Sequence, residues 1–438
     1  MIATKKNRRF LKKSFIFSII FLFLFSFSAV EGNNTEGLSG LIITTAAAEE
    51  NPMLESAAKL MAEKAAMLIA QSAAKINGST VTRPVTTPEK NYIVGYYGAW
   101  TAYSGFTPDK INASKLTHIN YAFANIGDDL KIQLGYPDID PANIKKLNNL
   151  KKANVNLKTL ISVGGWTWSG KYSDAALTDA SRTKFAESCV EFIVKYDLDG
   201  IDIDWEYPVS GGLSANKRRT DDKRNFTLLL QKIREKLDER GKQDGKHYLL
   251  SIAGGCGYDY VNNVELENIY KYIDYANIMT YDIHAVWDKY TDFCAPLYTN
   301  NKSPETKWSV SSAINLWLST GFPAEKIVVG VPFYGYRYNK VNSMNNGLYQ
   351  SHSGGTALSY DTIASSYLSN SNYKQYFDTA SKVPWLFDGS TFISYDDARS
   401  IRAKGAYIRS KSLAGAAIWE LSQDSKGTLL DALYNSLR

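Results

Sequence analysis

The chain has 438 residues, of which 44% are hydrophobic and 21% are charged, as in globular proteins that bury a sizeable core. Its formal net charge is +6, and the first 30 residues hold six Lys and Arg residues and no acid. Because the rest of the chain is neutral, the charge gives no indication of nucleic-acid binding, and we expect no such partner.

The beginning of the chain has the pattern of a secretory signal. A basic stretch is followed by the apolar run SFIFSIIFLFLFSFSAV at residues 14–30 and then by Glu31. An uncleaved membrane anchor is the alternative, but the run is shorter than the ~20 apolar residues of a spanning helix. We expect a signal peptide over residues 1–28, with Ser26 and Ser28 at the cleavage site, and a secreted, extracellular protein without membrane contact after cleavage.

The next segment, residues 29–90, is predicted to hold one helix and a linker. Asn51 and Pro52 suit the first turn of a helix, and apolar residues at spacings of three and four give the 51–77 helix an apolar stripe. The helix would pack on the domain that follows or belong to a dispensable pro-segment, and docking of a protein partner is the alternative. The Ser/Thr/Pro-rich stretch at 78–90 is predicted to be a linker.

Over residues 91–438, short apolar stretches alternate with longer amphipathic ones. This alternation is typical of the α/β class with a parallel sheet, and eight repeats indicate a (β/α)8 TIM barrel. The expected strands are Tyr92–Tyr97, Leu116–Asn125, Leu157–Gly164, Gly200–Glu206, Tyr248–Gly254, Tyr275–Tyr281, Ile327–Tyr334 and Leu413–Glu420. The expected helices cover residues 142–153, 182–196, 223–240, 308–319, 395–404 and 427–437.

One interval after the seventh expected strand is too long for a loop. The residues from Arg337 to Trp385 are rich in Tyr, Ser and Asn and contain two or three strand-like pieces. We therefore expect a small α+β insertion at about residues 337–388.

The fourth expected strand, in the stretch LDGIDIDWEYP, carries acids within an apolar run. Asp202, Asp204 and Glu206 are two residues apart and share one face, whereas the apolar residues between them share the other. In a barrel the acidic face points inward, near the C-terminal strand ends where barrels hold their active sites. Confined carboxylates cannot all ionise cheaply, so at least one pKa should rise. A raised pKa would make Glu206 a general acid near neutral pH.

Two other interpretations of the acids need weighing. A cation site stays open on spacing alone, because clustered carboxylates bind Mg²⁺ or Ca²⁺. A structural role would bury charges without a matching Lys or Arg, which is costly, and only Asp199, which lies off the shared face, fits that role. The three cysteines and four scattered histidines match no zinc motif or catalytic triad, and the cysteines allow at most one disulfide.

Aromatic residues recur where the expected strands end. Tyr96 and Trp100 end the first strand, Trp166 and Trp168 follow the third, and Trp419 ends the eighth. An isolated aromatic residue is more often part of a core. Several at one rim, however, offer flat apolar platforms for the C–H faces of sugar rings.

Together these motifs resemble the chitinases of glycoside hydrolase family 18. DGIDIDWEYP fits the family pattern DxxDxDxE, and SVGG fits SxGG on the preceding strand. GYYGAW, YAFA, MTYD and AAIWELSQD look like the family's strands one, two, six and eight. The resemblance covers Tyr92 to Arg438, and the insertion looks like the α+β domain of the bacterial-type subfamily with deep clefts.

The resemblance implies retaining hydrolysis of β-1,4-linked N-acetylglucosamine polymers, with the substrate's own acetamido oxygen as nucleophile. Glu206 would be the acid and then the base, and Asp204 would hold the acetamido N–H with help from Asp202. Tyr281 would hydrogen-bond the acetamido oxygen, and Trp419 would form the floor under the distorted sugar. No metal or cofactor is implied. The other residues expected to bind substrate are Tyr96, Trp100, Phe123, Trp166, Met279 and Asp282.

One departure and two alternatives accompany this resemblance. The family often has Arg where FYGYRY places Tyr336, with Arg337 one step later, which puts the contact on that side in doubt. An endo-β-N-acetylglucosaminidase acting on N-glycans shares the acidic motif. A chitin-binding lectin-like protein typically lacks the acid, whereas Glu206 is present here.

Overall fold

The computed structural model describes residues 91–304 and 308–438. The predicted signal peptide, the 51–77 helix and the linker at 78–90 lie outside the described residues. In the described part of the chain, no helix is long and apolar enough to cross a membrane.

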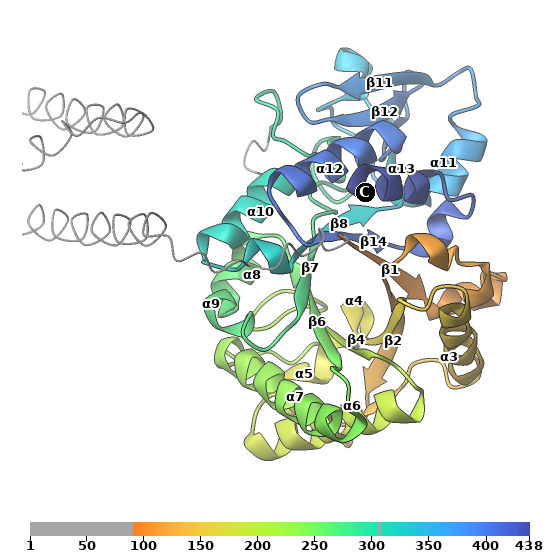
Figure 1. Ribbon diagram of the computed structural model, residues 1–438. Helices are drawn as coiled ribbons and strands as arrows, with labels where there is room; N and C mark the ends of the chain where they lie inside the picture. The colour runs from red at the N-terminus through yellow and green to blue at the C-terminus, as the bar shows by residue number, and fades with distance from the viewer. Residues whose placement is uncertain (1–90, 305–307) are drawn as a thin grey trace, which may run out of the picture. The chain divides into compact units, whose positions relative to one another are not determined.

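Eight parallel strands close into a barrel, as predicted (Figure 1). They follow one another in the order β1-β14-β8-β7-β6-β5-β4-β2, and β2 pairs back onto β1. The strands are β1 (Tyr92–Gly98), β2 (His118–Ile126), β4 (Lys158–Gly164), β5 (Gly200–Asp204), β6 (Leu249–Gly255), β7 (Tyr275–Met279), β8 (Ile327–Pro332) and β14 (Gly415–Trp419).

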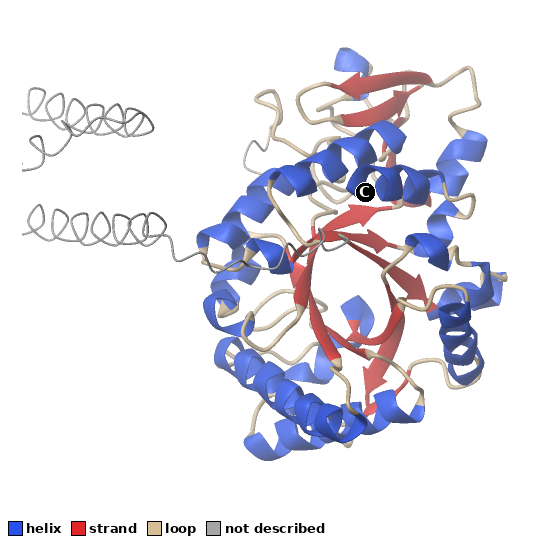
Figure 2. Ribbon diagram, viewed as in Figure 1, coloured by secondary structure: helices blue, strands red, loops and turns tan. Residues whose placement is uncertain are grey.

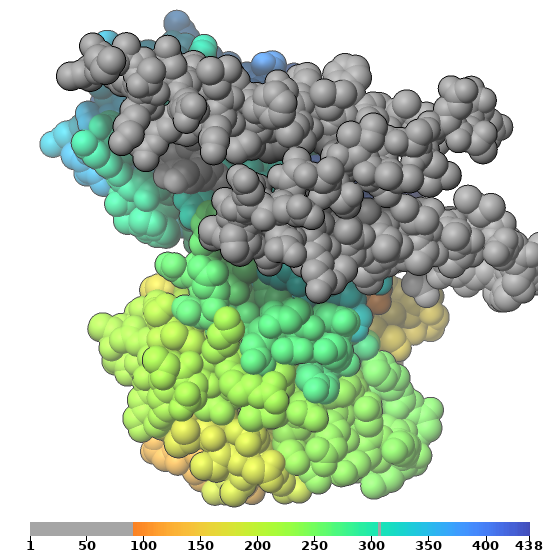
Figure 3. All heavy atoms as spheres, turned by 90° about the vertical axis from the view of Figure 1, so that its left-hand side faces the viewer, coloured from red at the N-terminus to blue at the C-terminus, as the bar shows by residue number. Residues whose placement is uncertain are grey.

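Helices surround the barrel on its outside (Figure 2). In the space-filling view, the yellow-green to green residues that include α7 and α9 make up much of the lower part of this face (Figure 3). The longer helices are α3 (Asp140–Asn149), α6 (Asp179–Lys195), α7 (Asp222–Asp244), α10 (Val310–Ser319), α12 (Ala398–Ser410) and α13 (Thr428–Leu437). The shorter ones are α4 (Gly165–Trp168), α5 (Tyr172–Ala175), α8 (Tyr258–Asn263), α9 (Leu266–Ile269) and α11 (Tyr360–Ser366).

The two faces of β5 separate as the sequence predicts. Ile201, Ile203 and Trp205 are buried in the layer between barrel and helices. The Trp205 ring stacks on Tyr172 of α5 at a centroid distance of 5.3 Å and meets Phe226 of α7 edge-on at 5.4 Å. This apolar face fixes the strand, so the acids on the other face point into the barrel.

The insertion is a five-stranded antiparallel sheet with one helix, α11. Its strand order is β10-β9-β13-β12-β11. The sheet lies at the top of Figure 1, where β11 and β12 are labelled. Its strands are β9 (Tyr334–Tyr338), β10 (Gly355–Ser359), β11 (Lys374–Asp378), β12 (Val383–Phe387) and β13 (Phe392–Ser394). The sheet thus begins earlier and ends later than the expected range 337–388.

Three barrel strands end two residues before their predicted C-terminal ends, and the other five end within one residue of the prediction. The expected strand Ile327–Tyr334 joins the end of β8 to the start of β9, because the apolar run of VPFYGYRY hides the change of sheet at Phe333. The expected strand ending at Glu206 stops at Asp204, so Glu206 lies in the turn beyond β5. The expected strand ending at Tyr281 stops at Met279.

A ninth strand of the barrel sheet, β3 (Ile132–Leu134), was not predicted; it pairs antiparallel with β2. Its three residues are too few to show a period.

Candidate active site

The three acids of the β5 stretch lie together at the C-terminal end of the barrel strands. Asp202 and Asp204 belong to β5, and Glu206 follows two residues later. All three are buried, with exposed fractions of 0%, 3% and 8%. The site therefore gathers three carboxylates away from water, as the sequence predicts.

Asp202 is held by uncharged donors from four different strands. Its Oδ2 accepts hydrogen bonds from Tyr96 Oη at 2.9 Å and Ser162 Oγ at 2.8 Å. Its Oδ1 accepts from Ser251 Oγ at 2.6 Å and Asn277 Nδ2 at 3.4 Å. Burial raises the pKa of Asp202, and these hydrogen bonds act against that rise. Within residues 91–304 and 308–438, the carboxyl of Asp202 is thereby fixed by uncharged groups.

Asp204 is buried with less support. Its Oδ1 makes no hydrogen bond within the described residues. Burial, followed by the charges of Glu206 and Asp202, holds the pKa of Asp204 well above its usual value. A buried carboxyl without a partner is costly, and a hydrogen-bond donor on a ligand would relieve that cost.

The main chain of Glu206 is fixed by two loops. Its N–H donates to Ser169 Oγ at 2.8 Å, and its carbonyl accepts from Asn216 Nδ2 at 3.2 Å. Burial raises the pKa of Glu206 to about 7; a hydrogen bond from Tyr207 opposes this rise, and the charge of Asp282 adds to it. Glu206 can therefore carry or release a proton near neutral pH, which a general acid and base requires.

The two glycines of SVGG make room for this arrangement. Gly164 has φ +98°, and a Cβ on it would come within 2.3 Å of the Asp204 carbonyl oxygen. Gly165 has φ +73°, and a Cβ there would come within 2.7 Å of the Phe123 ring. Side chains at these positions would displace both β5 and the aromatic floor of the site.

Asp282 joins the barrel to the inserted sheet. Its Oδ1 accepts hydrogen bonds from Tyr334 Oη at 2.5 Å and Tyr336 Oη at 2.8 Å. Burial raises the pKa of Asp282, and these phenols lower it. The Tyr281 ring meets Tyr334 edge-on at 6.1 Å.

The departure at Tyr336 and Arg337 has a structural explanation. Tyr336 donates its phenol proton to Asp282, so this position contacts the site. Arg337 Nη1 instead donates to Tyr367 Oη at 3.1 Å. Because Tyr367 directly follows α11 of the insertion, Arg337 does not take the position of the missing Arg.

An aromatic floor lies on the side of β14, β1 and β2. Trp419 stacks on Phe123 at 5.8 Å, and it lies 5.5 Å from Tyr96 and 6.3 Å from Trp100, measured between ring centroids. Trp100 is 36% exposed and Trp166 is 50% exposed, so both offer surface to a ligand. Met279, at the end of β7, is half-buried.

Tyr96, which is predicted to bind substrate, lies against Asp202 in the structure. It is only 2% exposed, and its phenol bonds to Asp202. Tyr96 therefore acts on the carboxyl beneath the site, because its position in the middle of β1 points it into the barrel rather than at the rim.

Sequence reasoning missed several supporting residues. Ser251 and Asn277 hold Asp202, and Ser169 holds the main chain of Glu206. A signal existed for the first two, since each is a polar residue in an otherwise apolar strand. Trp287 is 67% exposed and meets the Tyr336 ring edge-on at 5.8 Å, next to Asp282. No spacing in the sequence places Trp287 there.

Asp199 has a structural role, and one cysteine, Cys294, touches the site through Asp282, whose Oδ1 lies 3.8 Å from the Cys294 Sγ. Asp199 Oδ2 lies 2.7 Å from Lys151 Nζ and accepts from the Thr159 N–H at 2.8 Å, as its structural interpretation expects. The three cysteines are unpaired. Over residues 91–304 and 308–438, no group of three or more His, Cys, Asp or Glu side chains is arranged to hold a metal ion.

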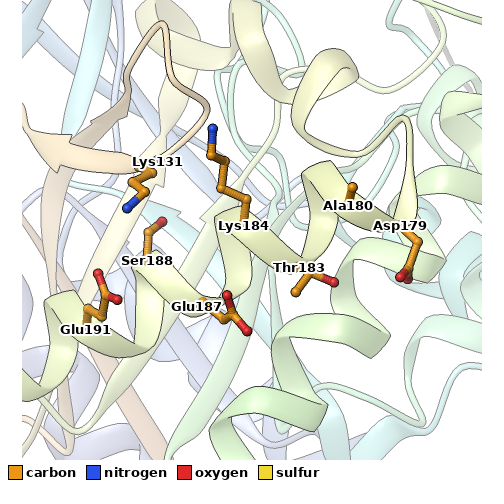
Figure 4. A pocket seen from close by; sticks show the side chains of 8 residues that line it. All are labelled: Lys131, Asp179, Ala180, Thr183, Lys184, Glu187, Ser188 and Glu191. Atoms are coloured by element: carbon orange, nitrogen blue, oxygen red, sulfur yellow. The ribbon is translucent and has the colours of Figure 1, made fainter.

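A separate hollow of about 530 Å³ lies on the outer face of α6 (Figure 4). Charged side chains such as Lys131, Lys184 and Glu187 line it. These residues come from the outer helix layer and the loop before β3, so this hollow is separate from the carboxylate site.

The carboxylate geometry agrees with the comparison to known families. The family described as glycosyl hydrolases family 18 matches residues 92–424. The chain belongs to this family. It is 42% identical to Chitinase A1 of Niallia circulans over 406 residues, covering 79% of this chain and 58% of that protein. It is 33% identical to Endochitinase 1 of Metarhizium robertsii, covering 76% of this chain and 81% of that protein.

Solved structures of the family share the fold. The chitinase ChiA74 from Bacillus thuringiensis superposes with a TM-score of 0.77 at 34% identity, covering 80% of this chain and 70% of that one. A family 18 N-acetylglucosaminidase from Paenibacillus barengoltzii superposes with a TM-score of 0.73 at 40% identity, covering 79% of this chain and 99% of that one. The chain is thus a family 18 glycoside hydrolase with a TIM barrel.

Proposed function

We propose that the protein hydrolyses chitin, the β-1,4-linked polymer of N-acetylglucosamine, by retaining, substrate-assisted catalysis. The observation that carries the proposal is the burial of Asp204 and Glu206, two residues apart in sequence, with no cationic side chain bonded to either within the described residues. Their pKa values are raised for that reason. Relatives named chitinase support the choice of substrate.

Glu206 begins the reaction as the acid. With a pKa of about 7, about half of the Glu206 carboxyls carry a proton at neutral pH, and this form donates it to the glycosidic oxygen as the bond breaks. The carbonyl oxygen of the substrate's acetamido group attacks the anomeric carbon and closes an oxazolinium ring. Glu206 then accepts a proton from the water that opens this ring.

Asp204 orients and stabilises the acetamido group. Its Oδ1, which makes no hydrogen bond within the described residues, is suited to accept the acetamido N–H. As the ring closes, that nitrogen becomes positive, and a carboxylate beside it is stabilising. Asp202, fixed by its four donors, positions Asp204. Tyr281 would donate to the acetamido oxygen.

The aromatic floor would hold the sugar on the non-leaving side. Trp419 would lie under the distorted ring, with Phe123 behind it and Trp100 and Trp166 farther along. Exposed aromatic side chains on both sides of the acids favour a polymer over a single sugar.

A second candidate is an N-acetylglucosaminidase, which the Paenibacillus barengoltzii structure favours by its name and 40% identity. Action on N-glycans is the further alternative from the acidic motif. Incubation with chitohexaose and with an N-glycoprotein separates the three. We expect di- and trisaccharide products from the hexamer and no glycan release. Monosaccharide alone would favour the second candidate, and released glycan would favour the third.

The reaction proposed here uses no metal. We expect that EDTA leaves the initial rate on chitohexaose within about twofold of the untreated rate. Strong inhibition, reversed by adding Mg²⁺ or Ca²⁺, would restore the cation interpretation of the carboxylates.

We also propose that residues 1–28 direct export and that the enzyme acts outside the cell. The basic and apolar pattern of that segment supports this. N-terminal sequencing of protein from the culture medium tests it. A mature protein beginning after residue 28 is expected, and retention of the whole chain inside the cell would contradict it.

A further inference from the structure

A hollow of about 320 Å³ is lined by residues of the loop after β7, and its volume is at the lower end of the range of ~300–1,000 Å³ typical of small-molecule sites. Ile283, which directly follows Asp282, forms one wall, and Trp308 forms another. Asp288 and Lys289 supply polar groups at its edge. The hollow therefore combines an aromatic wall with hydrogen-bonding groups, as sugar sites do.

Several side chains that line the hollow are held by contacts with one another and with the main chain. His284 is buried between two acids, with Nδ1 3.4 Å from Asp288 Oδ2 and Nε2 3.6 Å from Asp292 Oδ2. Asp292 Oδ2 also accepts from Ser303 Oγ at 2.7 Å, and Asp288 Oδ2 accepts from the Ala285 N–H at 3.0 Å. Groups fixed in this way form a preorganised surface.

Trp308 continues the aromatic surface to Tyr258. The two rings meet edge-on with centroids 5.2 Å apart, and Tyr258 is 50% exposed. Trp308 directly precedes Ser309, the N-cap of α10, and Tyr258 is the first residue of α8. In a TIM barrel the helices run opposite to the strands, so both aromatics lie on the catalytic face.

The order of the barrel strands places this pair opposite the aromatic floor. In the ring β1-β14-β8-β7-β6-β5-β4-β2, β6 is diametrically opposite β1. Tyr258 follows β6, and Trp100 follows β1. A straight polymer bound over Trp100 and past Glu206 would therefore leave the barrel mouth over Tyr258, beside the loop after β7 that carries Trp287 and the hollow.

We propose that Trp308, Tyr258 and the adjoining hollow bind N-acetylglucosamine units of the leaving end of a long substrate, beyond the sugar next to Trp287. The proposal rests on the proposed function, because it assigns the occupant as the same polymer. Trp308 and Tyr258 stack on the sugar, and the Lys289 ammonium donates to its acetamido or hydroxyl oxygens.

The test compares a long and a short substrate. Chitohexaose can reach the hollow, whereas a chitobioside with a small fluorogenic leaving group ends near Glu206. For Trp308→Ala and Tyr258→Ala, we expect the ratio of kcat/KM on the hexamer to kcat/KM on the chitobioside to fall about tenfold, equivalent to about 1.4 kcal/mol. Trp308→Phe should retain most of the ratio.

The matched control is Tyr298→Ala. Tyr298 is 39% exposed in the same loop, but its ring packs against Tyr407 of α12. This control should keep the wild-type ratio. A wild-type ratio in Trp308→Ala and Tyr258→Ala would overturn the proposal, and so would equal losses on both substrates, because these leave the ratio unchanged.

Failure of the proposed function gives a different result. In that case the wild type cleaves neither substrate, and calorimetry on Glu206→Gln decides the binding question. Weaker chitohexaose binding in Glu206→Gln/Trp308→Ala than in Glu206→Gln alone would support the outer site. Equal or absent binding in both would overturn it.

Discussion

Two buried acidic groups of this molecule differ in whether a cation accompanies them. Asp396, at the end of the insertion, lies 2.5 Å from Lys404 Nζ of α12, and both side chains are almost fully buried. Burial raises the pKa of Asp396, and Lys404 lowers it. Asp204 is equally buried, yet only other acids act on its pKa, and they raise it. A cation beside a buried acid offsets the cost of burying its charge, whereas an acid without one is available for chemistry.

The largest expected effect is the fall in activity when the acid, Glu206, is removed. Glu206→Gln keeps the volume of the side chain but removes the proton donor, so kcat on chitohexaose should fall by about 10²–10⁴-fold or more. Circular dichroism should show an unchanged fold.

Asp199→Asn is the matched control for this loss, because Asp199 lies in the same motif but pairs with Lys151 outside the barrel. Its activity should stay within about threefold of wild type. Near-normal activity in Glu206→Gln would refute the assigned acid.

Lys404→Met should affect stability rather than chemistry. It leaves Asp396 buried without its cation, and breaking such a pair costs about 3–5 kcal/mol of unfolding free energy. Denaturant unfolding measures this cost. The double variant Lys404→Met/Asp396→Leu should recover most of it, since a buried pair can be replaced by apolar residues.

An unfolding free energy of Lys404→Met equal to that of wild type would contradict the contrast drawn between Asp396 and Asp204. A shift in the pH profile of kcat/KM in Lys404→Met, measured at equal folded concentration, would also contradict it. The Lys404–Asp396 pair would then act on the active site.

The Asp282 charge should have a smaller, pH-dependent effect. Because this charge raises the pKa of Glu206, Asp282→Asn should lower that pKa. The acid form of Glu206 is then lost at lower pH, so the alkaline limb of kcat/KM moves to lower pH. Asp378→Asn, in the inserted sheet, should leave the limb in place. A limb that moves to higher pH in Asp282→Asn would contradict this assignment.

The sequence predicts the barrel and its acids for a physical reason. Eight short apolar runs follow one another at regular spacing, and a face of acids within one buried run is rare enough to indicate a site. The donors to Asp202 come from Tyr96, Ser162, Ser251 and Asn277 on four strands, so their convergence depends on the register of the whole barrel.

The strand boundaries and the contacts made by loop residues were harder to predict from the sequence. The change of sheet at Phe333 lies within one apolar run, so periodicity does not show it. The position of Trp287 depends on how the loop after β7 folds back to Tyr336, which no local pattern encodes. Tyr96 was assigned to the rim because its burial depends on how far β1 extends.

The most direct test of an acid buried without a cation is the pH dependence of stability in wild type and Glu206→Gln. In the folded state the pKa of Glu206 is about 7, against 4.5 for an ordinary Glu. The stabilising contribution of this raised pKa is full below pH 4.5 and is lost as pH rises through 7. Glu206→Gln should therefore gain about 2–3 kcal/mol of unfolding free energy over wild type between pH 5 and pH 8.5. A constant difference, or a gain by wild type over that range, would contradict the account.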